Sequence, residues 1–469
     1  MKTRRDTAHG SHINRRDLLK SAGIGGGMVI ATTGAMLAPG RMVSAQDVTL
    51  SFWTPGGSPA FCDMQNAVAA NYTADNPGIN FEEVQCGVGE GDDYTQVFLA
   101  AIAAGNPPDA TVLWSTPVSY GARGALVAID DFMANATYAQ AENWPTGILE
   151  SCRFEGQTFG LPVAAGMYGM WYNRELFESK GIPSDRASFP KTWDELRQLS
   201  KEFTSWDGDY LESAGFVPLR DTITLPIWST LNGAQLYDAP NQTYTINADS
   251  NVAMMEYMVK WLDEDFKGDI NLVEQAGSWS AYPDEEGQPP AFQEGRLAVC
   301  ESGSWMMGDF YQYNEPVFEA WDVAPYPVGP SGTDSVSGYW PNWLAIPQGA
   351  EHVEEAFAYL DFMSGEGIVE WFATIPDMPT NTQVPEVVPQ IVVERRGEEF
   401  ASEIMGFFRS LAQNATAMWN SPVEDFANDQ LSVAVEKILT KASSPADALG
   451  EAQNAAQQEL ESFLGDAAG

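Results

Sequence analysis

Five short segments between residues 48 and 114 predict strands and helices in turn, and the first of these segments alternates apolar and polar positions. Residues 48–53 have the period of two that is typical of a strand. Ser58 and Pro59 then supply an N-cap residue and a first-turn proline for a helix that runs to about Asp75. The same reasoning predicts a strand, a helix and a third strand at residues 79–85, 94–104 and 109–114. The order β-α-β-α-β predicts a parallel sheet.

Two tryptophans stand at the carboxyl ends of predicted strands. Trp53 closes the first strand and Trp114 closes the third. Ligands of parallel α/β sheets bind in the crevice beyond these strand ends. We therefore expect both indoles to project toward a ligand, with a place in the core as the alternative for each.

The later part of the chain predicts further α/β structure. Thr192 and Glu195 form the capping box of an amphipathic helix that begins at Trp193 and includes Phe203. The Pro- and Gly-rich polar stretch 268–290 predicts a surface loop. Two more helical regions are predicted at residues 353–363 and 421–464.

Residues 1–45 resemble an export signal of the twin-arginine (Tat) type. Arg15-Arg16 precede a weakly apolar stretch rich in Gly and Ala, and Val43-Ser44-Ala45 offers the small residues that a signal peptidase reads. The alternative is a membrane anchor, which the six glycines from Gly23 to Gly40 disfavour. We therefore expect a mature chain that begins at residue 46 and works in the periplasm.

The charge balance excludes polyanionic partners. The chain has 24 Lys and Arg against 65 Asp and Glu, a net charge of -41. Removing residues 1–45 takes away seven basic and two acidic residues and leaves 17 basic and 63 acidic ones. Such a chain lacks the clustered Lys and Arg that bind nucleic acid or anionic lipid. It predicts a solvated acidic surface, for which a saline habitat is one explanation.

Nucleophilic and metal chemistry lacks its usual residues. His352 is the one histidine after residue 45, so a multi-histidine metal site is excluded. The loop 87–92 has the position of a dinucleotide fingerprint, but its third glycine is missing and its carboxylates would repel a pyrophosphate. Residues 207–212 lack the spacing of a calcium loop. We expect no catalytic residue, no metal and no cofactor.

The four cysteines form no CxxC pair, which excludes the common zinc and thioredoxin-like motifs. They are Cys62, Cys86, Cys152 and Cys300. An exported protein can form disulfides. Cys62 and Cys86 belong to the same β-α-β unit and are the first pair to consider, with buried free thiols as the alternative.

The tryptophans carry more information about a ligand. All 15 lie after residue 45, and several stand beside glycines or in polar segments, most clearly Trp228, Trp279, Trp305 and Trp340. Indole faces stack on the C–H faces of sugar rings, while Asp, Glu and Asn bind the hydroxyls. The same residue types could hold a quaternary ammonium group or a polyamine. With so few basic residues, a phosphate or carboxylate ligand is the poorer match.

Five segments in sequence order carry a family resemblance. They are AAGNPPD at 103–109, GALVAIDDF at 124–132, FEG, GLP and WYN within 154–173, GIP and KTWDEL within 181–196, and AFQEGRLA followed by GSW within 291–305. Together they resemble the bacterial extracellular solute-binding proteins of family 1, the sugar-binding subunits of ABC importers. Phe159 and Val299 replace the tyrosine and methionine that are usual there, and the segment after about residue 400 matches only loosely.

The resemblance implies an α/β, two-lobed periplasmic-binding-protein fold with discontinuous lobes, a hinge and a ligand cleft between the lobes. The first lobe would comprise residues 46–163 and 344–398, and the second lobe residues 164–343 and 399–469. The chain would cross between the lobes near residues 162–166, 340–344 and 395–405.

The resemblance also implies a set of ligand-binding residues. Carried over by position, they are Trp53, Glu90, Trp114, Tyr168, Trp228, Asn232, Trp305 and Trp340, with Trp279 as a further member. Tyr339 stands where the family has a glycine, which puts the backbone contact of that segment in doubt.

The function implied is that of a monomeric binding protein without enzymatic activity. It would capture a sugar, which we interpret as an oligosaccharide, and deliver it to the membrane permease subunits of an ABC transporter. Two alternatives stay open: a binding protein for a cationic ligand such as a polyamine, and a secreted carbohydrate-active enzyme.

Overall fold

The structure, a computed structural model, describes residues 47–467 except 57–58, 89–93, 221, 283–288, 309–319, 386 and 418–420. The predicted Tat signal and Glu90 therefore lie outside the described residues. Among the helices that are described, none combines the length and the apolar character needed to cross a membrane.

The predicted β-α-β-α-β region is present, and both of its helices have the predicted bounds: α2 is Pro59–Asp75 and α3 is Tyr94–Ala104. The first predicted strand is wrong in one respect, because it is broken at Ser51. The Ser51 carbonyl still accepts from Asp109 N and Ala110 N, but its backbone N donates to the Asp109 carboxylate over 2.8 Å, and its Oγ donates to the same carboxylate over 2.9 Å. The strands of the region are β1 (Val48–Leu50), β2 (Phe52–Thr54), β3 (Ile79–Phe81), β4 (Gln85–Cys86) and β5 (Ala110–Leu113).

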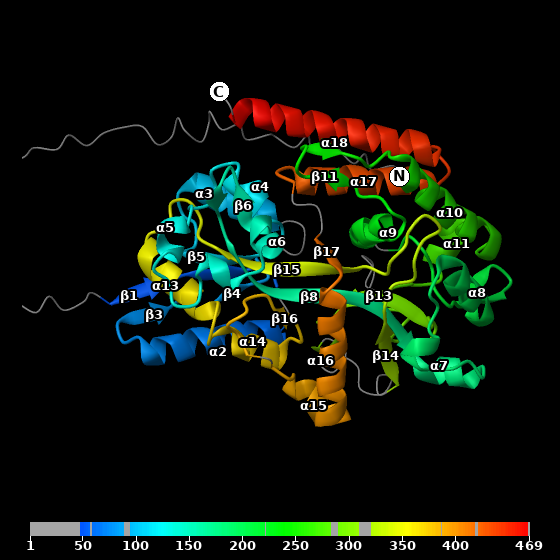
Figure 1. Cartoon of the computed structure of the whole chain (residues 1–469), viewed down its shortest axis with the longest axis horizontal. Helices are drawn as coiled ribbons and strands as arrows, with labels where there is room; N and C mark the ends of the chain where they lie inside the picture. The colour runs from blue at the N-terminus through cyan, green and yellow to red at the C-terminus, as the bar shows by residue number, and fades with distance from the viewer. Residues whose placement is uncertain are drawn as a thin grey trace, which may run out of the picture.

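One sheet of nine strands runs through the molecule (Figure 1). Its main path has the order β13-β8-β15-β5-β2-β4, while β14 and β16 pair with β8 and β17 pairs with β15. The strands not yet given are β8 (Leu161–Asn173), β13 (Val299–Gly303), β14 (Trp321–Ala324), β15 (Ser337–Ala345), β16 (Met378–Pro379) and β17 (Ala415–Ala417). β2 is parallel to β4 and β5, as predicted, whereas β8 is antiparallel to β13, β14, β15 and β16.

Strand β8 joins the two halves of the molecule. All 13 of its residues are buried, and at about 3.3 Å per residue it is about 43 Å long. Its first half pairs with β15 and its second half with β13 and β14. The segments 162–166 and 340–344, where we expected the chain to cross, lie opposite each other in the β8–β15 ladder.

Two large hydrophobic cores define two lobes. The first core takes its buried residues from 50–164 and 344–384, and the second takes its own from 165–339 and 378–460. A smaller third cluster, which includes Leu113, Cys152 and Trp343, packs on the other face of the first lobe's sheet. Val392 is already buried in the second core, so the third crossing lies before the predicted 395–405.

Helices cover both faces of the sheet in each lobe (Figure 1). Those of the first lobe, besides α2 and α3, are α4 (Pro117–Gly121), α5 (Asp130–Met133), α6 (Thr146–Leu149), α13 (Val353–Met363) and α14 (Ile368–Thr374). Those of the second lobe are α7 (Arg174–Ser179), α8 (Trp193–Phe203), α9 (Leu225–Leu231), α10 (Asp249–Asp265), α11 (Ile270–Glu274), α15 (Gln390–Arg396), α16 (Glu398–Ala412), α17 (Glu424–Leu439) and α18 (Pro445–Ala467). Short strands form peripheral hairpins: β6 (Arg153–Phe154) with β7 (Gln157–Thr158), β9 (Ser205–Asp207) with β10 (Tyr210–Ser213), and β11 (Tyr237–Asp238) with β12 (Thr243–Tyr244).

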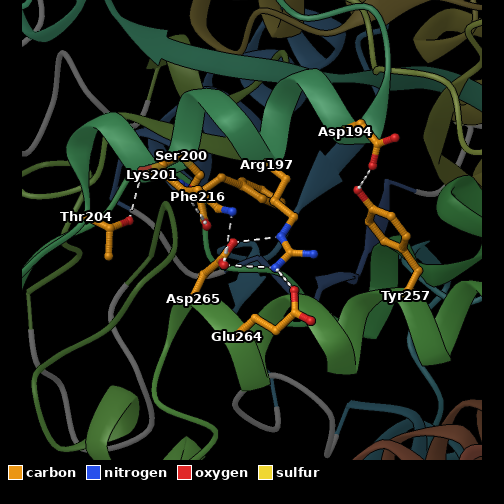
Figure 2. A network of polar contacts seen from close by, with 9 residues as sticks. All are labelled: Asp194, Arg197, Ser200, Lys201, Thr204, Phe216, Tyr257, Glu264 and Asp265. Atoms are coloured by element: carbon orange, nitrogen blue, oxygen red, sulfur yellow. Dashed lines mark hydrogen bonds and ion pairs between the residues drawn. The ribbon is translucent and has the colours of Figure 1, made fainter.

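An ion-pair network fixes α8 against α10 (Figure 2). Arg197 donates to Asp265 through Nε over 2.7 Å and to Glu264 through Nη2 over 2.6 Å. The capping box of Thr192 and Glu195 is confirmed at the start of α8. This network lies inside one lobe and is structural.

The predicted surface loop at 268–290 is wrong in its first part. It contains the short helix α11, and Trp279 after it is only 3% exposed. Ile270 and Val273 bury this segment against the second core. The predicted helices at 353–363 and in the C-terminal tail are confirmed as α13 and as α17 and α18.

Candidate ligand site between the lobes

A cavity of about 350 Å³ lies between the two lobes. The first lobe contributes the ends of β2 and β5, the start of α2 and the end of α14. The second lobe contributes Tyr168, Trp305 and Ile223, the last from the turn Thr222–Thr224. Strands β8 and β15 form the floor. The lining residues are Gly56, Phe61, Trp114, Tyr168, Ile223, Trp305, Trp340, Asn342, Trp371, Ile375 and Asp377.

The alternation of β15 decides which of its side chains face the cavity. Trp340 and Asn342, two residues apart, both line it. Trp343 follows a β-bulge and points to the opposite face, where its Nε1 donates to Ser151 Oγ over 3.1 Å. The period of two along β15 therefore places Trp343 in the third cluster, while the extra residue at the bulge, Val163, belongs to β8.

Trp305 connects the two lobes directly. It packs against both large cores, and its ring stands edge-on to Tyr168 with centroids 5.2 Å apart. Its Nε1 donates to Tyr282 Oη over 2.6 Å. Gly166 and Gly303 leave space for this indole, because a Cβ at either position would lie closer than 3.0 Å to its ring. The position of Trp305 thus depends on the absence of a side chain at Gly166 and Gly303.

A polar edge runs along one wall of the cavity. Trp114 Nε1 donates to Asn342 Oδ1 over 3.0 Å, and Asn342 Nδ2 in turn donates to Asp377 Oδ2 over 3.3 Å. Trp371 Nε1 also donates to Asp377 Oδ2, over 3.2 Å. Asp377 is only 2% exposed, and the described lining residues include no Lys or Arg. Such a wall accepts hydroxyl or ammonium donors and disfavours anions.

Four of the predicted site residues meet in this cavity: Trp114, Tyr168, Trp305 and Trp340. Trp114 is 38% exposed, which is unusual for an indole and consistent with a place at a ligand. Trp53 is not among the lining residues. It packs beside the third cluster, because β2 extends to Thr54 and turns the Trp53 side chain to that face of the sheet.

Two further predicted residues, Trp228 and Trp279, line a second cavity of about 200 Å³ inside the second lobe. Trp228 Nε1 donates to both oxygens of Glu301, over 3.2 and 3.0 Å. Tyr282 also lines this second cavity, and its Oη bonds to Trp305 and to Ser302. The two cavities are therefore neighbours across the Tyr282–Trp305 hydrogen bond.

Asn232 has a structural position. It is 2% exposed, its Nδ2 donates to the Ser250 carbonyl over 2.8 Å, and its Oδ1 accepts from Ser331 N over 3.1 Å. It lines neither of the two cavities. Within the described residues no group of three or more His, Cys, Asp or Glu is arranged to hold a metal ion.

Comparison with known proteins decides the family. The model of the bacterial extracellular solute-binding proteins matches residues 63–370, which is more than half of the chain. The chain belongs to this family. A binding protein of Brucella abortus is 23% identical over 334 residues, which are 67% of this chain and 71% of that protein.

Solved structures of binding proteins share the fold of this family member. CpMnBP1 with mannotriose bound has a TM-score of 0.72 at 22% identity and covers 87% of this chain and 100% of its own. The maltose/maltodextrin-binding domain of Bdellovibrio bacteriovorus, bound to maltotriose, has a TM-score of 0.68 at 18% identity, with 88% and 100% covered. The predicted α/β, two-lobed periplasmic-binding-protein fold is thereby confirmed, and the family is one of exported binding proteins.

Proposed function

We propose that this protein binds an oligosaccharide in the cavity between its lobes and delivers it, chemically unchanged, to the permease subunits of an ABC transporter. Its place of work would be the periplasm, reached through the Tat pathway. The observation that carries this proposal is the make-up of the cavity: four indoles, two further rings and one edge of Asn342 and Asp377.

This lining matches the surface of a sugar. The C–H faces of a pyranose are apolar and stack on indole rings, while its hydroxyls donate to carboxylate and amide oxygens at the ring edge. Trp114 and Trp340 supply faces, and Asp377 supplies an acceptor that is already fixed by Trp371 and Asn342. The mannotriose and maltotriose bound by the two structural neighbours are consistent with a ligand of this class.

Binding would proceed by closure of the lobes. A ligand that contacts both lobes favours the closed arrangement by the difference between its affinities for the closed and open states. Trp305 and Ile223 line the cavity on the side of the second lobe, and Trp114 and Asp377 line it on the side of the first lobe. The long strands β8 and β15 are the connection about which the lobes would turn.

A binding protein for a cationic ligand is the second candidate. Asp377 favours it, since a buried carboxylate among aromatic rings also holds an ammonium group. A cationic ligand would lose affinity steeply as salt increases, whereas a neutral sugar would not.

The test is a Trp305→Ala substitution measured by isothermal titration calorimetry against manno- and malto-oligosaccharides. Loss of the indole should weaken binding by about 1–3 kcal/mol, which is about 5- to 150-fold in Kd. Trp206→Ala is the matched control, because Trp206 is half-buried in β9 and contacts Lys267 away from the cavity. Unchanged affinity of a folded Trp305→Ala protein would remove this cavity from the proposed site.

A further inference from the structure

Two thiols lie beside the wall of the cavity. Cys62 is in the first turn of α2, and Cys86 is the last residue of β4. Cys62 Sγ lies 3.9 Å from Gly56 O, and the same carbonyl accepts over 2.9 Å from the backbone N of Gly87, the residue after Cys86. Burial, and next the neighbouring Cys62 thiol, raise the pKa of Cys86 to about 12. The two sulfur atoms are therefore neighbours.

The other two cysteines have no such partner. Cys152 is buried in the third cluster of the first lobe, and Cys300 is buried in the core of the second lobe. The two residues belong to different hydrophobic clusters in different lobes, so they do not form a pair with each other. Of the four free thiols, Cys62 and Cys86 are therefore the pair that lies close together.

We propose that Cys62 and Cys86 form a disulfide in the exported protein. Proteins outside the cytoplasm meet dithiol oxidases, whose own disulfide is the oxidant for this reaction. The Cys62 thiolate attacks that disulfide and releases one thiol of the oxidase. Cys86 then loses its proton and attacks Cys62 Sγ, which releases the second thiol. Two protein thiols are oxidised, one oxidase disulfide is reduced, and both protons end on the oxidase.

The disulfide would brace the first-lobe wall of the cavity. Phe61, next to Cys62 in the chain, lines the cavity together with Gly56. The Phe61 ring stands edge-on to Trp371, with centroids 5.1 Å apart. A bond from Cys62 to the end of β4 would fix the first turn of α2, and with it Phe61 and Gly56. This consequence for ligand affinity rests on the proposed function; the bond itself does not.

Counting thiols tests the bond. The full chain is expressed with its own export signal, recovered from outside the cytoplasm, and denatured in iodoacetamide without reductant. Mass spectrometry should find alkylation at Cys152 and Cys300 only, and at all four cysteines after reduction. The Cys62→Ser variant should gain alkylation at Cys86, whereas Cys152→Ala should change nothing at that pair. Alkylation of all four cysteines without reduction, or another pairing, would overturn the proposal.

Reductant tests the bracing effect. Reduction should lower the Tm of the wild type by several degrees and weaken its sugar binding, because the loop closed by the bond is released. The Cys62→Ser/Cys86→Ser double variant should show neither response. If the bond is found but reduction leaves the affinity unchanged, the bracing of the cavity is refuted while the disulfide stands. If no sugar binds at all, the thiol count still decides on the bond.

Discussion

A single added methyl group at Gly166 should disturb the proposed site without touching its chemistry. A Cβ at this position would lie closer than 3.0 Å to the Cε3 and Cζ3 atoms of Trp305 and 3.2 Å from Asp377 Oδ1. Carbon atoms pack at about 3.5–4.0 Å, so the indole has to move away from strand β8. Overpacking of this kind costs about 1–3 kcal/mol. The shift also strains the bond from Trp305 Nε1 to Tyr282 Oη.

The expected result for Gly166→Ala is a loss of sugar affinity of about 5- to 150-fold, because the displaced indole no longer meets the ligand in the pre-formed geometry. Isothermal titration calorimetry with the oligosaccharide that the wild type binds measures this loss, and thermal unfolding checks the fold.

A matched control is available in the first lobe. A Cβ at Gly121 would lie just as close to the ring of Phe159, but this ring belongs to the third cluster, on the face of the sheet opposite Trp340 and Asn342. Gly121→Ala should therefore lower the Tm while the affinity of the folded protein stays within about twofold of the wild type. Wild-type affinity in folded Gly166→Ala, or equal losses in both variants, would refute the role of Trp305.

Three further substitutions test other parts of the structure. Asp377→Asn should weaken the binding of a neutral sugar by about 1.5–3 kcal/mol at any salt concentration, since it removes a charged acceptor. For a cationic ligand, calorimetry at two ionic strengths would instead show that the affinity no longer depends on salt. Phe463→Ala should lower the free energy of unfolding by about 0.5–1.5 kcal/mol, because it removes the edge-on contact between the rings of Phe463 in the second lobe and Phe154 in the first, whose centroids are 6.5 Å apart; an unchanged denaturation midpoint would contradict this. Arg197→Met should lower the free energy of unfolding by about 3 kcal/mol, because it leaves the 8%-exposed side chain of Asp265 with only Lys201; an unchanged denaturation midpoint would contradict it.

Local sequence signals were sufficient where the structure depends on neighbouring residues. Pro59 begins α2, and the capping box of Thr192 and Glu195 begins α8, because each of these effects acts within one turn of a helix. The break at Ser51 was not predictable in this way. It depends on Asp109, 58 residues away, whose carboxylate accepts the hydrogen bond of the Ser51 backbone N.

The residues of the site likewise divide into those that local sequence signals predict and those that depend on distant contacts. Trp114, Tyr168, Trp305 and Trp340 were predicted from strand ends and from the family's motifs, and they line one cavity. Asp377 was missed, because it follows a helix in a segment without a motif and reaches the cavity only through the tertiary packing of α14. The period of two along β15 could have indicated Asn342, since it is two residues from Trp340.

Trp228 and Trp279 show where the sequence misleads. Both look accessible in the chain, because glycines and polar residues surround them, yet they are 4% and 3% exposed and their indole N–H groups bond inside the second lobe. A tryptophan in a polar segment can be covered by distant elements of the chain.

Titration of the exported protein with mannotriose, maltotriose, the matching monosaccharides and a polyamine, followed by mass analysis of the recovered ligand, is the most direct test of the proposed function. We expect at least one oligosaccharide to bind with a Kd of about 1 μM or tighter, at least tenfold more tightly than its monosaccharide, and to be recovered intact. Binding of the polyamine alone, or recovery of a cleaved sugar, would contradict the proposal that this protein delivers an oligosaccharide unchanged.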